Sequence, residues 1–261
     1  MIEVRDLVKD YGGFRAVDHI SFSVAPGKIF GLLGPNGAGK TTTIKMLTTA
    51  LEPTSGSISV ADHDPRREPD QVRRAFGIVF QDPSLDEDLT AAENMEFHGV
   101  LYGVSQPARR ERIEGLLRFV GLWERRDAFV KQYSGGMKRR LEIARALLHS
   151  PKILFLDEPT LGLDPQTRNH IWGYVCDQSR VNGMTVLFTT HYMDEADKIA
   201  DELAVIDQGK LIAQGTPASL KERSMKASLE EAFIAMTGHS IRDEEGTSVD
   251  QMRLTRRLWR R

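Results

Sequence analysis

The sequence predicts an α/β protein with a mostly parallel central sheet, an N-terminal antiparallel β layer and an inserted α-helical subdomain. Short apolar runs at residues 29–33 and 152–156 have the length of buried parallel strands. Residues 2–8 and 19–24 alternate apolar with polar side chains, which is typical of strands with one exposed face. Between residues 82 and 150 the apolar positions change to helical spacing, which indicates the inserted helices.

The other elements follow in chain order from apolar spacing and from the turn residues between segments. Strands are predicted over 57–60, 77–80, 185–189, 203–206 and 211–213, and helices over 41–50, 89–102, 109–120, 136–149, 166–180, 194–200, 218–223 and 228–236. Residues 62–69 are predicted as a polar loop and 207–210 as a hairpin turn. We expect residues 1–238 to form one domain, with the helical subdomain inserted at about 82–150.

The tail after residue 238 differs in composition from the rest of the chain. Residues 239–261 hold an acidic run and five arginines from Arg253 onward, with little to bury. We therefore expect a flexible, solvated terminus. The alternative is contact with a membrane surface or a partner through Leu254, Leu258 and Trp259.

Composition limits the classes of function. The 261 residues are 40% hydrophobic and 28% charged, as in soluble globular proteins, and the formal net charge of −2 gives no electrostatic case for nucleic acid. The single cysteine, Cys176, cannot form an internal disulfide, which favours a reducing compartment and a packing role. The charged N-terminus is unlike a secretory signal, and no run of about 18 apolar residues occurs that would span a bilayer.

A phosphate-loop motif lies between the strand at 29–33 and the helix after it. Its residues are Gly34, Pro35, Asn36, Gly37, Ala38, Gly39, Lys40 and Thr41, followed by Thr42. The glycines allow backbone N–H groups to turn towards an anion, and the helix start adds further free N–H groups. We expect Lys40 to reach the terminal phosphates and the Thr41 hydroxyl to bind Mg²⁺. The alternative is an ordinary glycine turn, but lysine and threonine at these offsets favour a P-loop NTPase core.

Two carboxylates follow the apolar strand at 152–156. Asp157 and Glu158 stand at its C-terminal end, where α/β sheets bind their ligands. We expect Asp157 to hold the magnesium shell and Glu158 to polarise an attacking water as a general base. The alternative, two acids that cap a helix start, is weaker beside a phosphate loop.

A second anion site is predicted at Ser134, Gly135 and Gly136, directly before a helix. Free N–H groups and a hydroxyl at a helix N-terminus favour an anion. Alone, this segment would be a simple helix cap. Because one nucleotide seldom needs two phosphate sites in one chain, a second copy could supply this segment across an interface.

With these motifs in this order, the sequence resembles ATPase subunits of the ATP-binding cassette (ABC) family over about residues 2–238. The resemblance implies that Tyr11 stacks on adenine and that Gln81 senses Mg²⁺ and γ-phosphate and links to a transmembrane partner. It also implies that Asp164 contacts the opposing subunit and that His191 contacts the γ-phosphate and helps to organise the attacking water. The family usually has leucine and glutamine where Tyr133 and Met137 stand here, so we expect altered interface detail and retained ATP binding.

Three stretches, 81–90, 133–140 and 229–233, resemble exporters of the antibiotic-resistance type, such as daunorubicin exporters. This resemblance implies a homodimer, or a paired ABC ATPase, that binds ATP and Mg²⁺. It also implies a separate transmembrane permease, a peripheral cytoplasmic location on the inner face of the cell membrane, and a drug, lipid, polysaccharide or ion as cargo. No nucleic-acid partner is expected.

Three alternatives to an exporter ATPase stay open. The ATPase subunit of an ABC importer is the alternative most similar to the predicted function. A soluble ABC ATPase of DNA maintenance would need a long coiled-coil insertion, and no sustained heptads occur between the motifs. A translation-associated factor normally carries two cassettes in one chain.

Overall fold

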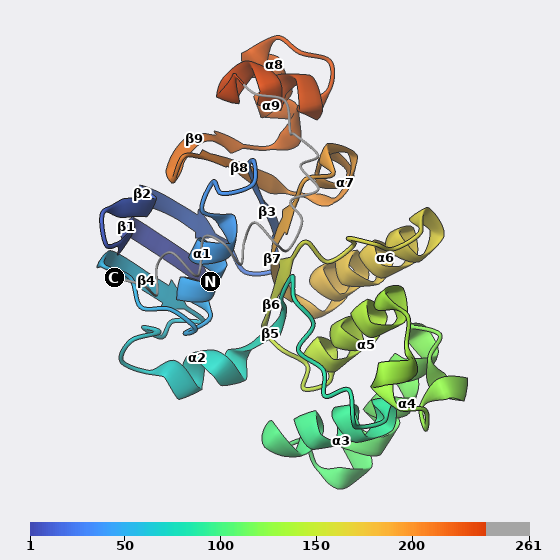
Figure 1. Ribbon diagram of the computed structural model, residues 1–261. Helices are drawn as coiled ribbons and strands as arrows, with labels where there is room; N and C mark the ends of the chain where they lie inside the picture. The colour runs from blue at the N-terminus through green and yellow to red at the C-terminus, as the bar shows by residue number, and fades with distance from the viewer. Residues whose placement is uncertain (239–261) are drawn as a thin grey trace.

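The computed structural model describes residues 1–238, in which a central sheet has six strands in the order β5-β6-β7-β3-β8-β9 (Figure 1). All neighbouring strands are parallel except the pair β8–β9, which forms a hairpin. The bounds are β3 Ile29–Leu33, β5 Phe76–Val79, β6 Ile153–Asp157, β7 Thr185–Thr190, β8 Glu202–Asp207 and β9 Lys210–Gly215. The predicted mostly parallel sheet is confirmed.

A second, antiparallel sheet contains β1 (Ile2–Tyr11), β2 (Phe14–Val24) and β4 (Ser55–Val60) in the order β2-β1-β4. It confirms the predicted N-terminal β layer. β2 begins at Phe14 rather than at residue 19, because backbone pairing with β1 continues to the turn that joins them, where Tyr11 lies opposite Phe14. Side-chain alternation alone does not reveal this extension.

The central sheet is buried on both faces. Successive residues of β3 point to opposite sides, so Ile29 and Leu33 join the apolar cluster under the helices while Phe30 and Leu32 face the antiparallel layer. Phe30 stacks on Phe22 of β2 with ring centroids 5.3 Å apart. Burial on both faces is why these strands are continuous apolar runs.

The helices lie largely where the sequence predicts them. Their bounds are α1 Lys40–Leu47, α2 Pro69–Ala75, α3 Ala91–Leu101, α4 Gln106–Phe119, α5 Gly135–Leu147, α6 Pro165–Asn182, α7 Met193–Ile199, α8 Pro217–Ser224 and α9 Leu229–Thr237. Helix α2 has no counterpart in the prediction, since its sequence is polar and only Val72 is buried. Helices α3, α4 and α5 gather at the end of the molecule away from the antiparallel sheet (Figure 1).

Two further predictions are not tested by the structure. The predicted flexible tail, residues 239–261, lies outside the described residues. The division into one domain with an inserted helical subdomain stays a prediction. Within residues 1–238, no helix combines the length and apolarity needed to cross a membrane.

Candidate nucleotide-binding site

The phosphate loop, Gln81, the two acids and His191 follow four neighbouring strands of the central sheet. In the order β5, β6, β7, β3, these strands end before Gln81, at Asp157-Glu158, before His191 and at the phosphate loop. Because the four strands are parallel, their carboxyl ends lie at one edge of the sheet. Segments far apart in the sequence therefore meet there.

A cavity of about 920 Å³ opens at this edge. The predicted residues that line it are Tyr11, Asn36, Gly37, Ala38, Gly39, Lys40, Thr41, Thr42, Gln81, Asp157 and Glu158. Phe14, which the sequence analysis does not single out, lines it as well and is exposed. The volume and the mixture of aromatic, backbone and charged groups suit a nucleotide.

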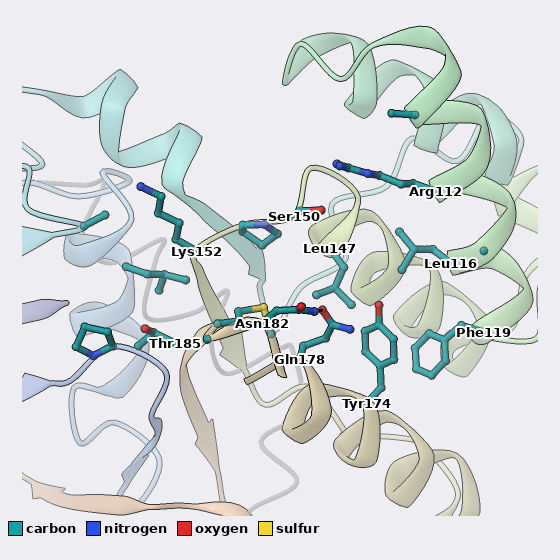
Figure 2. Close-up of a pocket in the computed structure, with 18 of the residues that line it drawn as sticks. Arg112, Leu116, Phe119, Leu147, Ser150, Lys152, Tyr174, Gln178, Asn182 and Thr185 are labelled. Carbon is teal, nitrogen blue, oxygen red and sulfur yellow. Dashed lines mark hydrogen bonds between the residues drawn. The ribbon is translucent and has the colours of Figure 1, made fainter. Parts of the chain in front are cut away.

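A larger cavity, of about 1010 Å³, is not this site. It lies between α4, α6 and the amino ends of β6 and β7, with Arg112, Tyr174 and Thr185 around it (Figure 2). None of the predicted site residues lines it.

The phosphate loop needs its glycines for steric reasons. Gly39 has φ of 108°, and a Cβ there would lie 2.5 Å from the Ala16 carbonyl oxygen. Lys40 is buried, and its Nζ donates to the carbonyls of Gly34 (2.8 Å) and Pro35 (3.1 Å). Burial lowers the pKa of Lys40, and the charges of Glu158 and Asp157 oppose that shift. The ammonium group is thus held inside the loop.

The two carboxylate oxygens of Asp157 differ, because one accepts a hydrogen bond and the other does not. Its side chain is 1% exposed, and Oδ1 accepts a hydrogen bond of 2.6 Å from Thr189 Oγ1. Its buried Oδ2 has no hydrogen-bond partner among the described residues. A buried acceptor without a donor is costly, and Mg²⁺ prefers oxygen ligands, so Asp157 together with the Thr41 hydroxyl on the same cavity fits Mg²⁺.

Glu158 adopts a strained backbone. Its φ is 51°, in the left-handed region that non-glycine residues seldom occupy. Its N–H donates to both the carbonyl (3.2 Å) and the hydroxyl (3.0 Å) of Thr189. The carboxylate Oε2 lies 2.5 Å from His191 Nδ1, which brings the two predicted catalytic side chains together.

The second predicted anion site lies elsewhere. Ser134 caps α5 by accepting a hydrogen bond from the Met137 N–H (3.3 Å). Ser134 and Gly135 are exposed, and none of the three residues Ser134, Gly135 and Gly136 lines the phosphate-loop cavity. Asp164 is likewise exposed and caps α6, and hydrogen bonds from the hydroxyl (2.6 Å) and N–H (2.9 Å) of Thr167 lower its pKa.

The two departures from the family pattern are accommodated by packing. Tyr133 is buried, and its hydroxyl donates to the Arg125 carbonyl at 2.7 Å. Met137 is partly buried against the apolar cluster. Cys176 packs against the same cluster, and burial raises the pKa of its thiol.

Two residues of the site were not found from the sequence. Thr189 binds both acids from the end of β7, and Arg139 on α5 donates to the backbone around Glu158. Thr189 stands two residues before His191, so its strand position was a usable signal. Arg139 carries no such signal, since its contacts depend on how α5 packs on the sheet.

A parallel sheet with a glycine-rich phosphate loop and two acids at its carboxyl edge defines a P-loop nucleoside triphosphatase. Residues 17–161, more than half of the chain, match the family model described as ABC transporter, and the chain belongs to that family. The sequence-based prediction of the family and of its ATPase activity is confirmed.

The curated relatives include ATP-binding proteins of resistance and export systems. The chain is 51% identical to the daunorubicin/doxorubicin resistance ATP-binding protein DrrA of Streptomyces peucetius, covering 84% of this chain and 66% of the relative. It is 44% identical to the Nod factor export ATP-binding protein I of Ralstonia nicotianae, covering 84% and 68%. The chain therefore spans about two thirds of the length of these curated relatives.

Solved structures agree on the fold. An ATP-binding subunit of an ABC transporter has a TM-score of 0.86 at 32% identity, covering 90% of this chain and 99% of that one. The ATP-binding cassette MJ0796, dimeric in a post-hydrolysis state with ADP and Pi, has a TM-score of 0.77 at 26% identity, covering 83% and 98%.

Proposed function

We propose that the chain is the ATP-hydrolysing subunit of an ABC exporter and drives a separate transmembrane permease. The observation that carries the proposal is the cavity lined by the phosphate loop from Asn36 to Thr42, by Asp157 and by Glu158. The Oδ2 of Asp157 has no hydrogen-bond partner among the described residues, and His191, which does not line the cavity, lies against the Glu158 carboxylate. Names of relatives that include drug resistance and export support the exporter branch, and among the expected kinds of cargo they support a drug.

The predicted site residues on the cavity contact different parts of ATP. Tyr11 stacks on adenine, the N–H groups of the loop from Gly34 to Thr42 surround the phosphates, and Lys40 contacts their terminal oxygens. Thr41, Gln81 and Asp157 line the cavity and would hold Mg²⁺. The ion, when bound, neutralises charge on the phosphate oxygens.

Hydrolysis depends on Glu158 and His191. The Glu158 carboxylate accepts a proton from the attacking water as the water approaches the γ-phosphate. His191, 2.5 Å from that carboxylate, keeps it oriented and contacts the γ-phosphate from the end of β7.

The site is completed by a second copy of the chain. The segment of Ser134, Gly135 and Gly136, of which the first two residues are exposed, lies outside the cavity of its own chain, so its N–H groups are available to the γ-phosphate held by the partner. Asp164, also exposed, faces the same interface. Dimer formation is supported by the dimeric cassette to which this chain is similar, and the head-to-tail arrangement is part of the proposal.

The membrane partner docks beside Gln81. A groove of about 390 Å³ runs between the segment after β5 and helix α3, and Phe80 and Ser84 line it. Phe97 and Leu101, 67% and 69% exposed, form its apolar rim. Docking there holds the chain on the inner face of the cell membrane. A permease that co-purifies with the chain supports this assignment, and an additional solute-binding protein would favour an importer instead.

Glu158→Gln tests the proposed chemistry. The variant should bind ATP with unchanged affinity, lose about 10²–10⁴ in kcat, and accumulate as an ATP-bound dimer, because the base is removed and the binding groups stay. Phosphate release and sedimentation velocity measure these outcomes.

Glu124→Gln changes an exposed glutamate in the short 3-10 helix Trp123–Arg125 that does not line the cavity; it is the control and should keep turnover within about twofold. Turnover by Glu158→Gln near the wild-type rate would show that another group is the base.

A further inference from the structure

Arg139 joins the helix that follows the Ser134 segment to the backbone of both acids. It is 7% exposed, and its Nη2 donates to the carbonyls of Asp157 and Glu158, each at 2.6 Å. Its Nε donates to the Pro159 carbonyl at 2.9 Å. One planar guanidinium thus donates to three consecutive buried carbonyls.

These carbonyls determine where the Glu158 side chain points. Two of them belong to the peptide groups on either side of the Glu158 Cα, whose φ of 51° is intrinsically unfavourable. Thr189 holds the Glu158 N–H from the β7 side, and Arg139 holds the carbonyls from the α5 side. A strained conformation persists only when its surroundings hold it in this way.

The same guanidinium also reaches the Gln81 segment. Arg139 Nη1 donates to the Phe80 carbonyl and lies 3.4 Å from Glu142 Oε2, one turn along α5. Glu142 Oε1 in turn accepts from the Ser84 N–H at 2.7 Å. One face of α5 therefore holds both ends of the segment that contains Gln81.

We propose that Arg139, assisted by Glu142, is a positioning residue that fixes the backbone of Glu158 and the Gln81 segment as one unit. The proposal rests on the proposed function, because it assigns Arg139 an effect on ATP turnover. Arg139 does not line the phosphate-loop cavity, so its loss should lower kcat and leave ATP affinity nearly unchanged.

Lysine cannot replace arginine here. Its ammonium is a single point, whereas the guanidinium presents five N–H donors in a plane to carbonyls on two separate segments. Arg139→Lys keeps the charge and frees most of these carbonyls, so it separates geometry from electrostatics.

The experiment compares Arg139→Lys with Arg140→Lys in the full chain. Arg140 is the neighbouring arginine on the same helix, but it donates to the Val120 carbonyl, away from the site. Arg139→Lys should lower kcat about tenfold or more, as misplacement of catalytic groups does. The dissociation constant of a fluorescent ATP analogue should change less than about twofold, and Arg140→Lys should change neither quantity.

Amide hydrogen exchange supplies a readout besides turnover. In Arg139→Lys the amides of residues 81–84 and 158–161 should exchange faster than in the wild type and in Arg140→Lys, because the backbone there has lost its anchor. Unchanged kcat and unchanged exchange would overturn the proposal. Wild-type chain that binds ATP without hydrolysing it would instead overturn the proposed function.

If Arg139→Lys does not fold, Glu142→Gln decides the matter by the same readouts. It keeps the shape of the side chain and weakens the bonds to Arg139 and Ser84. Faster exchange at residues 81–84 with lowered kcat supports the proposal, and wild-type values of both overturn it.

Discussion

Tyr133 illustrates how a single residue can depart from a family pattern without loss of the local structure. An apolar residue is expected there, and a buried hydroxyl without a partner would be destabilising. The Tyr133 ring fills the apolar position, and its hydroxyl donates to the Arg125 carbonyl at 2.7 Å. Burial raises the pKa of this phenol, so the hydroxyl stays a donor at neutral pH.

Tyr133→Phe should therefore destabilise the chain by about 1 kcal/mol, because the hydrogen bond from the Tyr133 hydroxyl to the Arg125 carbonyl is lost while the ring packing is retained. Urea unfolding measures the change as a shift in midpoint at constant slope. Tyr174→Phe is the matched control, since the half-buried Tyr174 hydroxyl makes no hydrogen bond to a described residue and its ring stacks on Phe119. Equal effects of the two substitutions would contradict the assignment.

At the scale of elements, α3 and the end of α5 meet through a stack of three rings. Tyr102 stacks on His98 and on His149, with ring centroids 4.4 and 4.0 Å apart. Burial lowers the pKa of His98 to about 3 and that of His149 to about 4. Arg145 and Arg112 add to these shifts, whereas the bond from His149 to the Phe76 carbonyl opposes one of them.

This stack should make the fold acid-sensitive. Both histidines are neutral in the folded chain between about pH 4 and 6.5, whereas the unfolded chain binds a proton at each, so the stability present above pH 6.5 is lost as the pH falls towards 4.

The paired substitution His98→Gln and His149→Gln should reduce the slope of unfolding free energy against pH in this window, by on the order of 1–2 kcal/mol per pH unit. Urea unfolding from pH 7 to 4.5 measures it. An identical slope in the double variant would mean that the stack is not the sensor.

At the scale of the whole molecule, the two parts of the proposed site lie at separate places on the chain. The phosphate loop and both acids line one cavity, and Ser134 lies on an exposed helix start outside it. Arg139 connects the two parts through the interior, from the helix that Ser134 caps to the carbonyls of the acids. Closure of a dimer at Ser134 would thus bear directly on the backbone of Glu158.

Ser134→Arg should block ATP-dependent dimerisation in a Glu158→Gln background while single-chain ATP binding stays within about twofold, because a bulky cation at the helix start occupies the place of the partner's phosphate. Sedimentation velocity with and without ATP measures it. Ser228→Arg, which removes an equivalent cap on α9, controls for the lost cap and should still dimerise. Dimerisation of Ser134→Arg would sink the shared-site proposal.

The sequence by itself determined the strands, the phosphate loop, the two acids and the family. Each of these depends on neighbours within a few residues, as in the glycine spacing from Gly34 to Gly39 or the apolar run before Asp157. Helix α2 and the first residues of β2 were not predicted from the sequence, because backbone pairing and tertiary packing, not side-chain periodicity, stabilise them.

Only the tertiary structure decided which groups act together. The strand order β5-β6-β7-β3 brings Gln81, Glu158 and His191 to one edge, and no local pattern encodes that order. The available oxygen of Asp157 and the three carbonyls held by Arg139 follow from packing of α5 and β7 against β6. Contacts between residues that are more than about a dozen positions apart in the sequence depend on how the whole hydrophobic core packs. They therefore form only when the chain is folded.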